Sequence, residues 1–181
     1  NSIAGQYDVV SMSHYLEHTR EPGEEIAAAH EALRPGGILF IEVPDPECKL
    51  GRLLGRYWVP WFQPQHQHLL SAKNVQRLME ARGFDVVDWH FGEAHQPVDF
   101  FFATYLQLNR LAPTYGMPWS PRLGFFKLFL HRMTWLFGLP WIGLGFTLDR
   151  LLAPVISRSS HSNTYRVTAR KRGPDTDSAA A

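Results

Sequence analysis

The chain has little cysteine and no long uninterrupted hydrophobic segment. Its single cysteine among 181 residues, Cys48, excludes an internal disulfide and a cysteine-rich zinc site. Charged residues make up 19% and apolar residues 45%, which excludes a disordered or low-complexity chain. No basic segment followed by an apolar one opens the sequence, so no signal peptide is expected. We therefore expect a cytoplasmic protein with a buried core.

Charge is distributed unevenly, although the net charge is only +1. Residues 1–50 carry 9 acidic and 3 basic residues, whereas residues 51–181 carry 8 and 15. The bases between residues 110 and 158 alternate with Phe and Leu, a pattern that suits a lipid surface better than a nucleic acid. No nucleic-acid partner is expected.

The first half of the chain predicts alternating strands and helices. Residues 7–12 and 38–43 are short, bounded and apolar, as buried parallel strands are. Between them, Pro22 and two glutamates open a helix that should end near residue 33, before Pro35-Gly36-Gly37. The three elements form a right-handed βαβ unit. An irregular covering loop is expected over residues 47–70.

Three later segments extend this α/β pattern. Ser71 should cap a helix that ends before Gly83, and residues 84–89 should form a strand. Residues 164–170 alternate between apolar and polar side chains, as a strand with one buried face does. The fold class is therefore α/β.

The segment 100–157 differs from the rest because its apolar residues recur at helical spacing and its charges are almost all basic. The longest uncharged run, residues 133–148, has 16 residues and contains three glycines and Pro140. That run is shorter than the roughly 20 residues that span a bilayer. We expect this segment to lie on a membrane without crossing it, or else to form a helical lid over the domain itself.

Four motifs, in this order and at these spacings, resemble the second half of a class I S-adenosylmethionine-dependent methyltransferase, of the group that includes the ubiquinone-pathway enzymes. They are Tyr7-Asp8-Val9-Val10 leading into Leu16-Glu17-His18, Ala32-Leu33-Arg34-Pro35-Gly36-Gly37, His66-Gln67-His68-Leu69-Leu70-Ser71, and Ala81-Arg82-Gly83-Phe84.

The resemblance implies a partial Rossmann-like sheet made of strands four to seven, with the antiparallel seventh strand between the fifth and the sixth. It divides the chain into a methyltransferase part (1–95 and 162–172), an apolar and basic helical insertion (96–161) and a disordered tail (173–181). The family's glycine-rich cofactor loop and acidic ribose-binding residue precede the fourth strand. The chain should therefore be a fragment that neither holds the cofactor tightly nor acts alone.

Site residues follow from the same resemblance. The segment after the fourth strand, Met12, Ser13 and His14, should contact the methionine end of S-adenosylmethionine, in the place where open α/β sheets bind ligands. The ubiquinone-pathway enzymes bind a divalent metal through a Glu-x-x-Glu-His run. Glu17 and His18 match that run, while His14 replaces its first acid.

The run His14-x-x-Glu17-His18 has two other interpretations. It resembles an inverted zinc-peptidase motif, although that motif needs a well-formed helix. It could instead line the cofactor cleft without any metal. His66 and His68 are also open to two interpretations, as a general base for a hydroxyl acceptor or as loop anchors that bond to the backbone.

The sequence thus predicts methyl transfer from S-adenosylmethionine to a small or lipid-like acceptor, with peripheral membrane contact through residues 100–157. The competing hypothesis is a non-catalytic lipid- or protein-binding module derived from the same fold.

Overall fold

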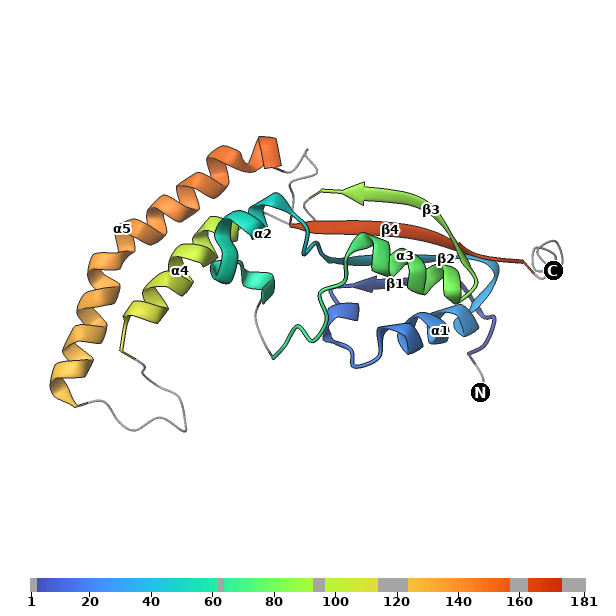
Figure 1. The fold of residues 1–181 in the computed structure, drawn as a ribbon, viewed down its shortest axis with the longest axis horizontal. Coiled ribbons are helices and arrows are strands. Elements are labelled where there is room, and N and C mark those ends of the chain that lie inside the picture. Colours follow the sequence, from blue (N-terminus) through green and yellow to red (C-terminus); the bar gives the residue numbers. More distant parts are fainter. Residues whose placement is uncertain (1–2, 62–63, 93–96, 114–123, 157–162, 174–181) are drawn as a thin grey trace.

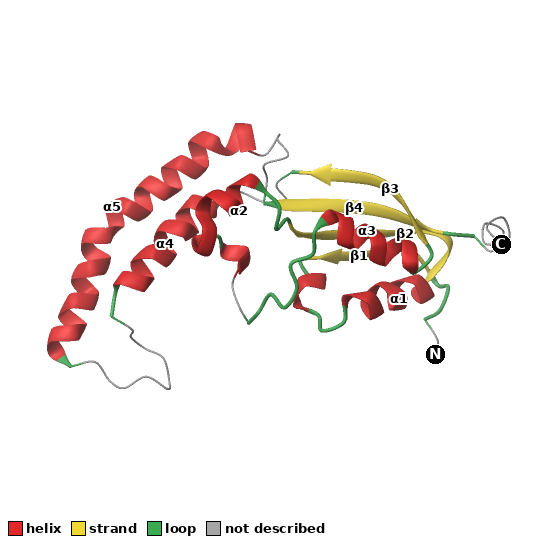
Figure 2. Cartoon of the chain, in the orientation of Figure 1, coloured by secondary structure: helices red, strands yellow, loops and turns green. Residues whose placement is uncertain are grey.

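The computed structural model describes residues 3–61, 64–92, 97–113, 124–156 and 163–173. It is a mixed α/β structure in which a twisted four-stranded sheet carries two helices on one face. Two long helices extend away from one end of that sheet (Figures 1 and 2). The expected fold class is confirmed.

The predicted βαβ unit forms the start of the fold. Strand β1 (Tyr7–Ser13) pairs in parallel with β2 (Leu33–Pro44), and helix α1 (Pro22–Ala32) connects them. Pro22 begins α1, where its missing amide hydrogen costs nothing, and Glu24 and Glu25 occupy the first turn. Strand β2 begins earlier than expected and continues through Gly36, whose φ of 76° suits glycine.

The sheet has the order β1-β2-β4-β3. Strand β4 (Thr164–Lys171) lies between β2 and β3 (Phe84–Phe91) and runs antiparallel to both. This is the strand order that the resemblance implied. The last strand in the chain therefore completes the centre of the sheet, because β2 and β3 do not pair with each other.

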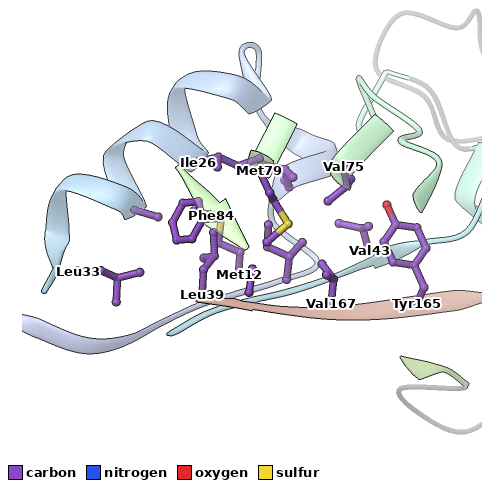
Figure 3. Packing of buried hydrophobic residues seen from close by; sticks show 14 residues of the cluster. Met12, Ile26, Leu33, Leu39, Val43, Val75, Met79, Phe84, Tyr165 and Val167 are labelled. Carbon is purple, nitrogen blue, oxygen red and sulfur yellow. The ribbon is translucent and has the colours of Figure 1, made fainter. Parts of the chain in front are cut away.

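The core lies between the sheet and two helices, α1 and α3 (Ala72–Ala81) (Figure 3). Val75 and Met79 of α3 belong to one cluster of buried side chains together with Leu39 and Val167 of the sheet. Ser71 is the N-cap of α3, as expected, although its side chain forms no capping hydrogen bond. Gly83, at a φ of 81°, ends the turn into β3.

Strand β1 is more exposed than the sequence predicted. Val9 is 56% exposed and Tyr7 47% exposed, so the expectation of a strand buried on both faces is wrong. The reason is position, because β1 is the edge strand among the described residues and pairs only with β2.

The predicted covering loop after β2 is largely helical, so that expectation is wrong in part. Helix α2 (Lys49–Leu54) is followed by short 3-10 turns at Gly55–Tyr57 and Val59–Trp61. The buried indole of Trp58 packs against Gly51, where a side chain would approach the ring to 3.0 Å. This contact explains a glycine within α2, which the sequence placed in a loop.

Helices α4 (Asp99–Leu111) and α5 (Phe125–Ile156) form an extended pair (Figure 1). Helix α5 continues without a break through Pro140 and the three glycines of the run 133–148, although these residues have low helix propensity. Two of those glycines are contact points, because an added Cβ would lie 2.5 Å from Leu108 at Gly138 and 2.6 Å from the Phe100 carbonyl at Gly145.

By length and composition α5 could cross a membrane, and 17% of its most apolar window is buried within the structure. Both α4 and α5 fall within the predicted insertion, residues 96–161. Apart from Gly173, the predicted tail lies outside the described residues.

Candidate active site at the carboxyl ends of the strands

His14 occupies a strained position directly after β1. Its backbone φ is 46°, in the left-handed region that residues other than glycine seldom adopt. Its Nδ1 lies 3.2 Å from Glu17 Oε1, and its Nε2 lies 3.6 Å from Glu42 Oε1. The hydrogen bond to Glu17 raises the pKa of His14 and outweighs burial, which lowers it. Strain of this kind is concentrated at functional sites.

Glu42, near the end of β2, joins β1 to β4. Its carboxylate accepts a hydrogen bond of 2.7 Å from Ser13 Oγ and forms an ion pair with Arg166. Burial by itself raises the pKa of Glu42, but the bonds from Ser13 and Arg166 outweigh it and leave the pKa below its ordinary value. Glu42 is therefore an ionised carboxylate that holds the ends of three strands together.

The sequence analysis did not identify Glu42 or Arg166. Glu42 is the only charged residue in the apolar run 38–43, and a lone acid in a buried strand needs a partner. That signal was available, but it does not reveal a partner 124 residues away.

Glu17 lies at the centre of the cluster, in a short 3-10 helix (Leu16–His18). It is 2% exposed, and its Oε2 is buried without a hydrogen bond within the described part of the chain. Its backbone carbonyl accepts bonds from the amides of Gln67 and His68, at 2.8 and 3.1 Å. The segment before α3 is thereby fixed against the end of β1.

Two histidines complete the cluster. His18 Nδ1 contacts the Gln65 carbonyl at 2.9 Å, and His66 Nδ1 contacts the Pro60 carbonyl at 2.7 Å. A carbonyl can only accept, so each Nδ1 carries a proton, and in the neutral imidazole Nε2 is then the nitrogen whose lone pair can bind a metal. One ligand atom from each of Glu17, His18 and His66 lies within 4.8 Å of the others.

A carboxylate oxygen with two imidazole nitrogens suits zinc and similar divalent ions, and the unsatisfied Glu17 Oε2 fits a cation. The structure thus places the two predicted ligands, Glu17 and His18, beside a third that the sequence did not assign to a metal. His14 forms a hydrogen bond with Glu17 and lies before the helix, which has only three residues. A zinc-peptidase motif needs its ligands on one well-formed helix, so this arrangement is not that of a zinc peptidase.

His66 and His68 both act as loop anchors. His68 Nε2 contacts the Arg20 carbonyl at 3.0 Å, in addition to the His66 bond to Pro60. The role of either as a general base stays a prediction. Of the residues predicted to contact the cofactor, Ser13 and His14 belong to the polar cluster, whereas Met12 packs into the core (Figure 3). Their contact with a cofactor also stays a prediction.

An apolar groove opens where α2 meets the ends of α4 and α5. It has a volume of about 290 Å³. Its lining is apolar except for one lysine and consists of Lys49, Leu50, Leu53, Phe100, Leu152, Val155 and Ile156. Lys49 begins α2, only five residues after the end of β2. The groove thus lies on the segment that directly follows the carboxyl end of the sheet.

Buried polar groups fix this region to the sheet. The Asp99 carboxylate accepts hydrogen bonds from Trp58 Nε1 at 3.1 Å and from Asn163 Nδ2 at 2.7 Å. The Asn163 carbonyl in turn accepts a bond of 2.8 Å from the amide of Asp45. The beginning of α4 is therefore tied both to the loop after β2 and to the residue before β4.

Comparison with known proteins finds similarity to methyltransferases and to polyketide synthases. Residues 2–88 match the family model of a methyltransferase domain. A ubiquinone biosynthesis O-methyltransferase from Marinobacter nauticus is 36% identical over 67 residues, which are 36% of this chain and 28% of that enzyme. A non-reducing polyketide synthase from Penicillium shearii is 29% identical over 100 residues, 52% of this chain and 4% of the synthase. The chain spans less than a third of either relative.

Among solved structures, a SAM-dependent methyltransferase from Archaeoglobus fulgidus is similar, with a TM-score of 0.49 and 15% identity. The similarity covers 93% of this chain and 61% of that protein.

Proposed function

Because residues 2–88 match the family model of a methyltransferase domain, we propose that the chain supplies the later strands of an enzyme that transfers a methyl group from S-adenosylmethionine to a lipid-like acceptor. The observation that carries the proposal is the sheet order β1-β2-β4-β3 with polar residues gathered after β1 and β2. Open α/β sheets bind their ligands at those carboxyl ends.

The open edge of β1 supports the view that further strands belong beside it. A hollow of about 490 Å³ runs along β1 and α1 and is lined by Tyr7, Val9, Val10 and Met12, among others. Two of these apolar side chains are about half exposed. An upstream strand pairing with β1 would cover them, and with it would come the glycine-rich loop that the family resemblance implies.

S-adenosylmethionine, when bound, supplies a methyl group that its positively charged sulfur has already activated. The protein therefore needs to align the acceptor more than to move protons. Ser13 and His14, at the end of β1, are the residues of this chain that would hold the methionine end. Ser13 is held in place by the carboxylate of Glu42, and His14 by that of Glu17.

A divalent cation is the second ligand that we propose for this edge. Glu17, His18 and His66 would bind it through one oxygen and two nitrogens. Three protein ligands leave coordination positions for an oxygen of the acceptor, so the ion would orient a hydroxyl group.

The apolar groove supports the lipid-like acceptor. A groove lined by six apolar side chains and Lys49 suits a hydrocarbon chain that ends in a polar or anionic group. Phe100 and Leu50 form its inner wall, whereas Leu53 is 73% exposed at its rim. The acceptor would place its tail there and its reactive end toward the strand ends.

The test uses the complete protein with its upstream residues, S-adenosylmethionine with a labelled methyl group, and a detergent-dispersed lipid extract. We expect label in the organic phase, reduced at least about tenfold by Leu53→Glu, since a carboxylate in an apolar groove repels a hydrocarbon tail. Leu111→Glu is the matched control, because Leu111 is also 73% exposed but does not line the groove.

Label found only in water-soluble products, or equal effects of the two substitutions, would contradict the lipid-like acceptor. If the complete protein neither binds S-adenosylmethionine nor transfers the methyl group, it is the non-catalytic binding module instead.

A further inference from the structure

One side of α5 is fixed against α4. The fully buried residues of α5 are Gly138, Gly145 and Asp149, at spacings of seven and four that place them on one side of a helix. Gly138 meets Leu108, and Gly145 meets the backbone of Phe100. These contacts settle which side of α5 faces the protein.

A second side of α5, about 120° around the helix from the first, is apolar and exposed. Phe126, Phe137, Leu144, Leu151 and Val155 follow one another at spacings of 11, 7, 7 and 4. We call these five residues the apolar stripe. Phe137 is 78% exposed, and Phe126 and Leu151 are each 69% exposed. At 1.5 Å per residue the stripe is about 44 Å long, far more than scattered surface leucines explain.

The exposed charges of α5 are basic. Arg132 and Arg150 are exposed and lie 18 residues apart, which is five helical turns, so they share one side of α5. That side lies about 120° around the helix from the stripe, and the two together flank the part of α5 that faces away from α4. Lys127 and Arg110 are exposed as well. The only acids of α4 and α5 are Asp99 and Asp149, which are 3% and 1% exposed. The outer surface of the pair is therefore apolar and positive.

We propose that the apolar stripe binds the surface of an anionic membrane, with α5 lying parallel to the bilayer. Apolar side chains would enter the headgroup boundary, while the arginines contact lipid phosphates. Charge favours this occupant over a second copy of the chain, because α4 and α5 carry exposed bases but no exposed acid that could pair with them across a dimer interface.

The contacts of α4 explain why α5 would lie along the membrane and not cross it. Helix α4 has 13 residues, about 20 Å, and carries the exposed Asn109 and Arg110 in its last turn. If α5 crossed the bilayer, its partner α4 and the buried Asp149 would be carried into hydrocarbon, where charged groups are costly. An interfacial position leaves α4 on the aqueous side.

The test measures cosedimentation of the full chain with phosphatidylcholine vesicles, with and without phosphatidylglycerol. We expect binding that requires the anionic lipid and weakens with salt. The double substitution Phe137→Ser/Leu151→Ser should weaken it at least about tenfold, through lost apolar burial. Arg132→Glu/Arg150→Glu should weaken binding by a similar factor, because it replaces two positive charges with negative ones that the anionic lipid repels.

The controls make changes of the same kind on β3 and α3. Val87→Ser removes an apolar side chain that is 56% exposed on β3, and Lys73→Glu/Arg77→Glu reverses two exposed charges on α3. Neither should change binding, and circular dichroism should show all variants folded. Equal weakening by the controls would overturn the proposal, and so would a dimer in sedimentation equilibrium that the stripe variant dissociates. Resistance of the bound chain to alkaline carbonate extraction would overturn the parallel orientation.

Discussion

The carboxylate of Asp149 accepts a hydrogen bond of 2.8 Å from the backbone amide of Phe101, 48 residues away in the first turn of α4. Its other oxygen accepts a bond of 3.0 Å from the amide of Phe100. Asp149 therefore caps α4 from a different helix, and it does so with a negative charge at the positive end of the helix dipole.

Asp149→Ala should lower the free energy of unfolding by about 1–2 kcal/mol, because two partly buried amides lose their acceptor. Urea unfolding followed by far-ultraviolet circular dichroism measures the change. Asp88→Ala, which alters an exposed aspartate on β3, should change it by less than about 0.5 kcal/mol. Equal stabilities of the two variants would show that the cap contributes nothing.

Two glycines of α5 should respond oppositely to the same substitution. Gly145→Ala should destabilise by about 1–3 kcal/mol, because its Cβ would lie 2.6 Å from the Phe100 carbonyl and from Thr104 Oγ1. Gly143→Ala should stabilise by up to about 1 kcal/mol, because nothing lies within 4 Å and alanine favours a helix. Thermal unfolding of both variants provides the comparison. A stabilising Gly145→Ala would mean that α4 and α5 do not pack as described.

Acid stability should depend on the pair between Glu42 and Arg166. The pKa of Glu42 is lower in the folded chain than its ordinary value of 4.5, so its ionised form stabilises the fold above that pH. This stabilisation is lost as the pH falls through the lowered pKa. Arg166→Gln removes one of the groups that lower the pKa of Glu42, while burial continues to raise it. The pKa of Glu42 should therefore rise, and acid unfolding should begin at a higher pH.

The same variant should lose roughly 1–3 kcal/mol of stability at neutral pH, because it leaves a buried carboxylate with fewer partners. Carbon-13 NMR titration of the Glu42 carboxyl measures the pKa directly. Arg82→Gln breaks an exposed pair with Glu24 and should shift neither the Glu42 pKa nor the acid transition. An unchanged Glu42 pKa in Arg166→Gln would contradict the assignment.

The proposed cation site distinguishes two neighbouring histidines. His66→Gln should weaken zinc binding by about 10- to 100-fold in calorimetry, because His66 supplies one of three ligands. His68→Gln should leave zinc binding unchanged, because His68 bonds to the Arg20 carbonyl and lies outside the ligand group. The assay needs neither the methyl donor nor an acceptor. Equal affinities for His66→Gln and the unaltered chain would refute the site.

The sequence predicted the parts of the fold that local pattern encodes. Apolar runs, Pro22 and Gly83 predicted the strands and helices, and the family motifs predicted the position of β4 between β2 and β3. It misjudged features that depend on distant partners. Gly138 and Gly145 looked like interruptions because a sequence shows their low helix propensity but not the approach of α4. Strand β1 looked buried because hydrophobicity does not reveal which strand lies at an edge.

In the candidate site, too, the sequence revealed the residues that are close along the chain but not their distant partners. The run from His14 to His18 could be recognised because its residues are adjacent in the sequence. Its association with Glu42, His66 and Arg166 could not be recognised, because the sheet and the loop before α3 bring these residues together from three other segments.

The most direct test of the central claim is calorimetric titration of S-adenosylmethionine into two proteins, the chain of 181 residues and the same chain extended by its natural upstream residues. If β1 to β4 are strands four to seven of a methyltransferase sheet, the extended protein binds the cofactor and the shorter chain shows no tight binding. Tight binding to the shorter chain would contradict the account, because it would place the whole cofactor site within strands that we have assigned to the second half of the fold.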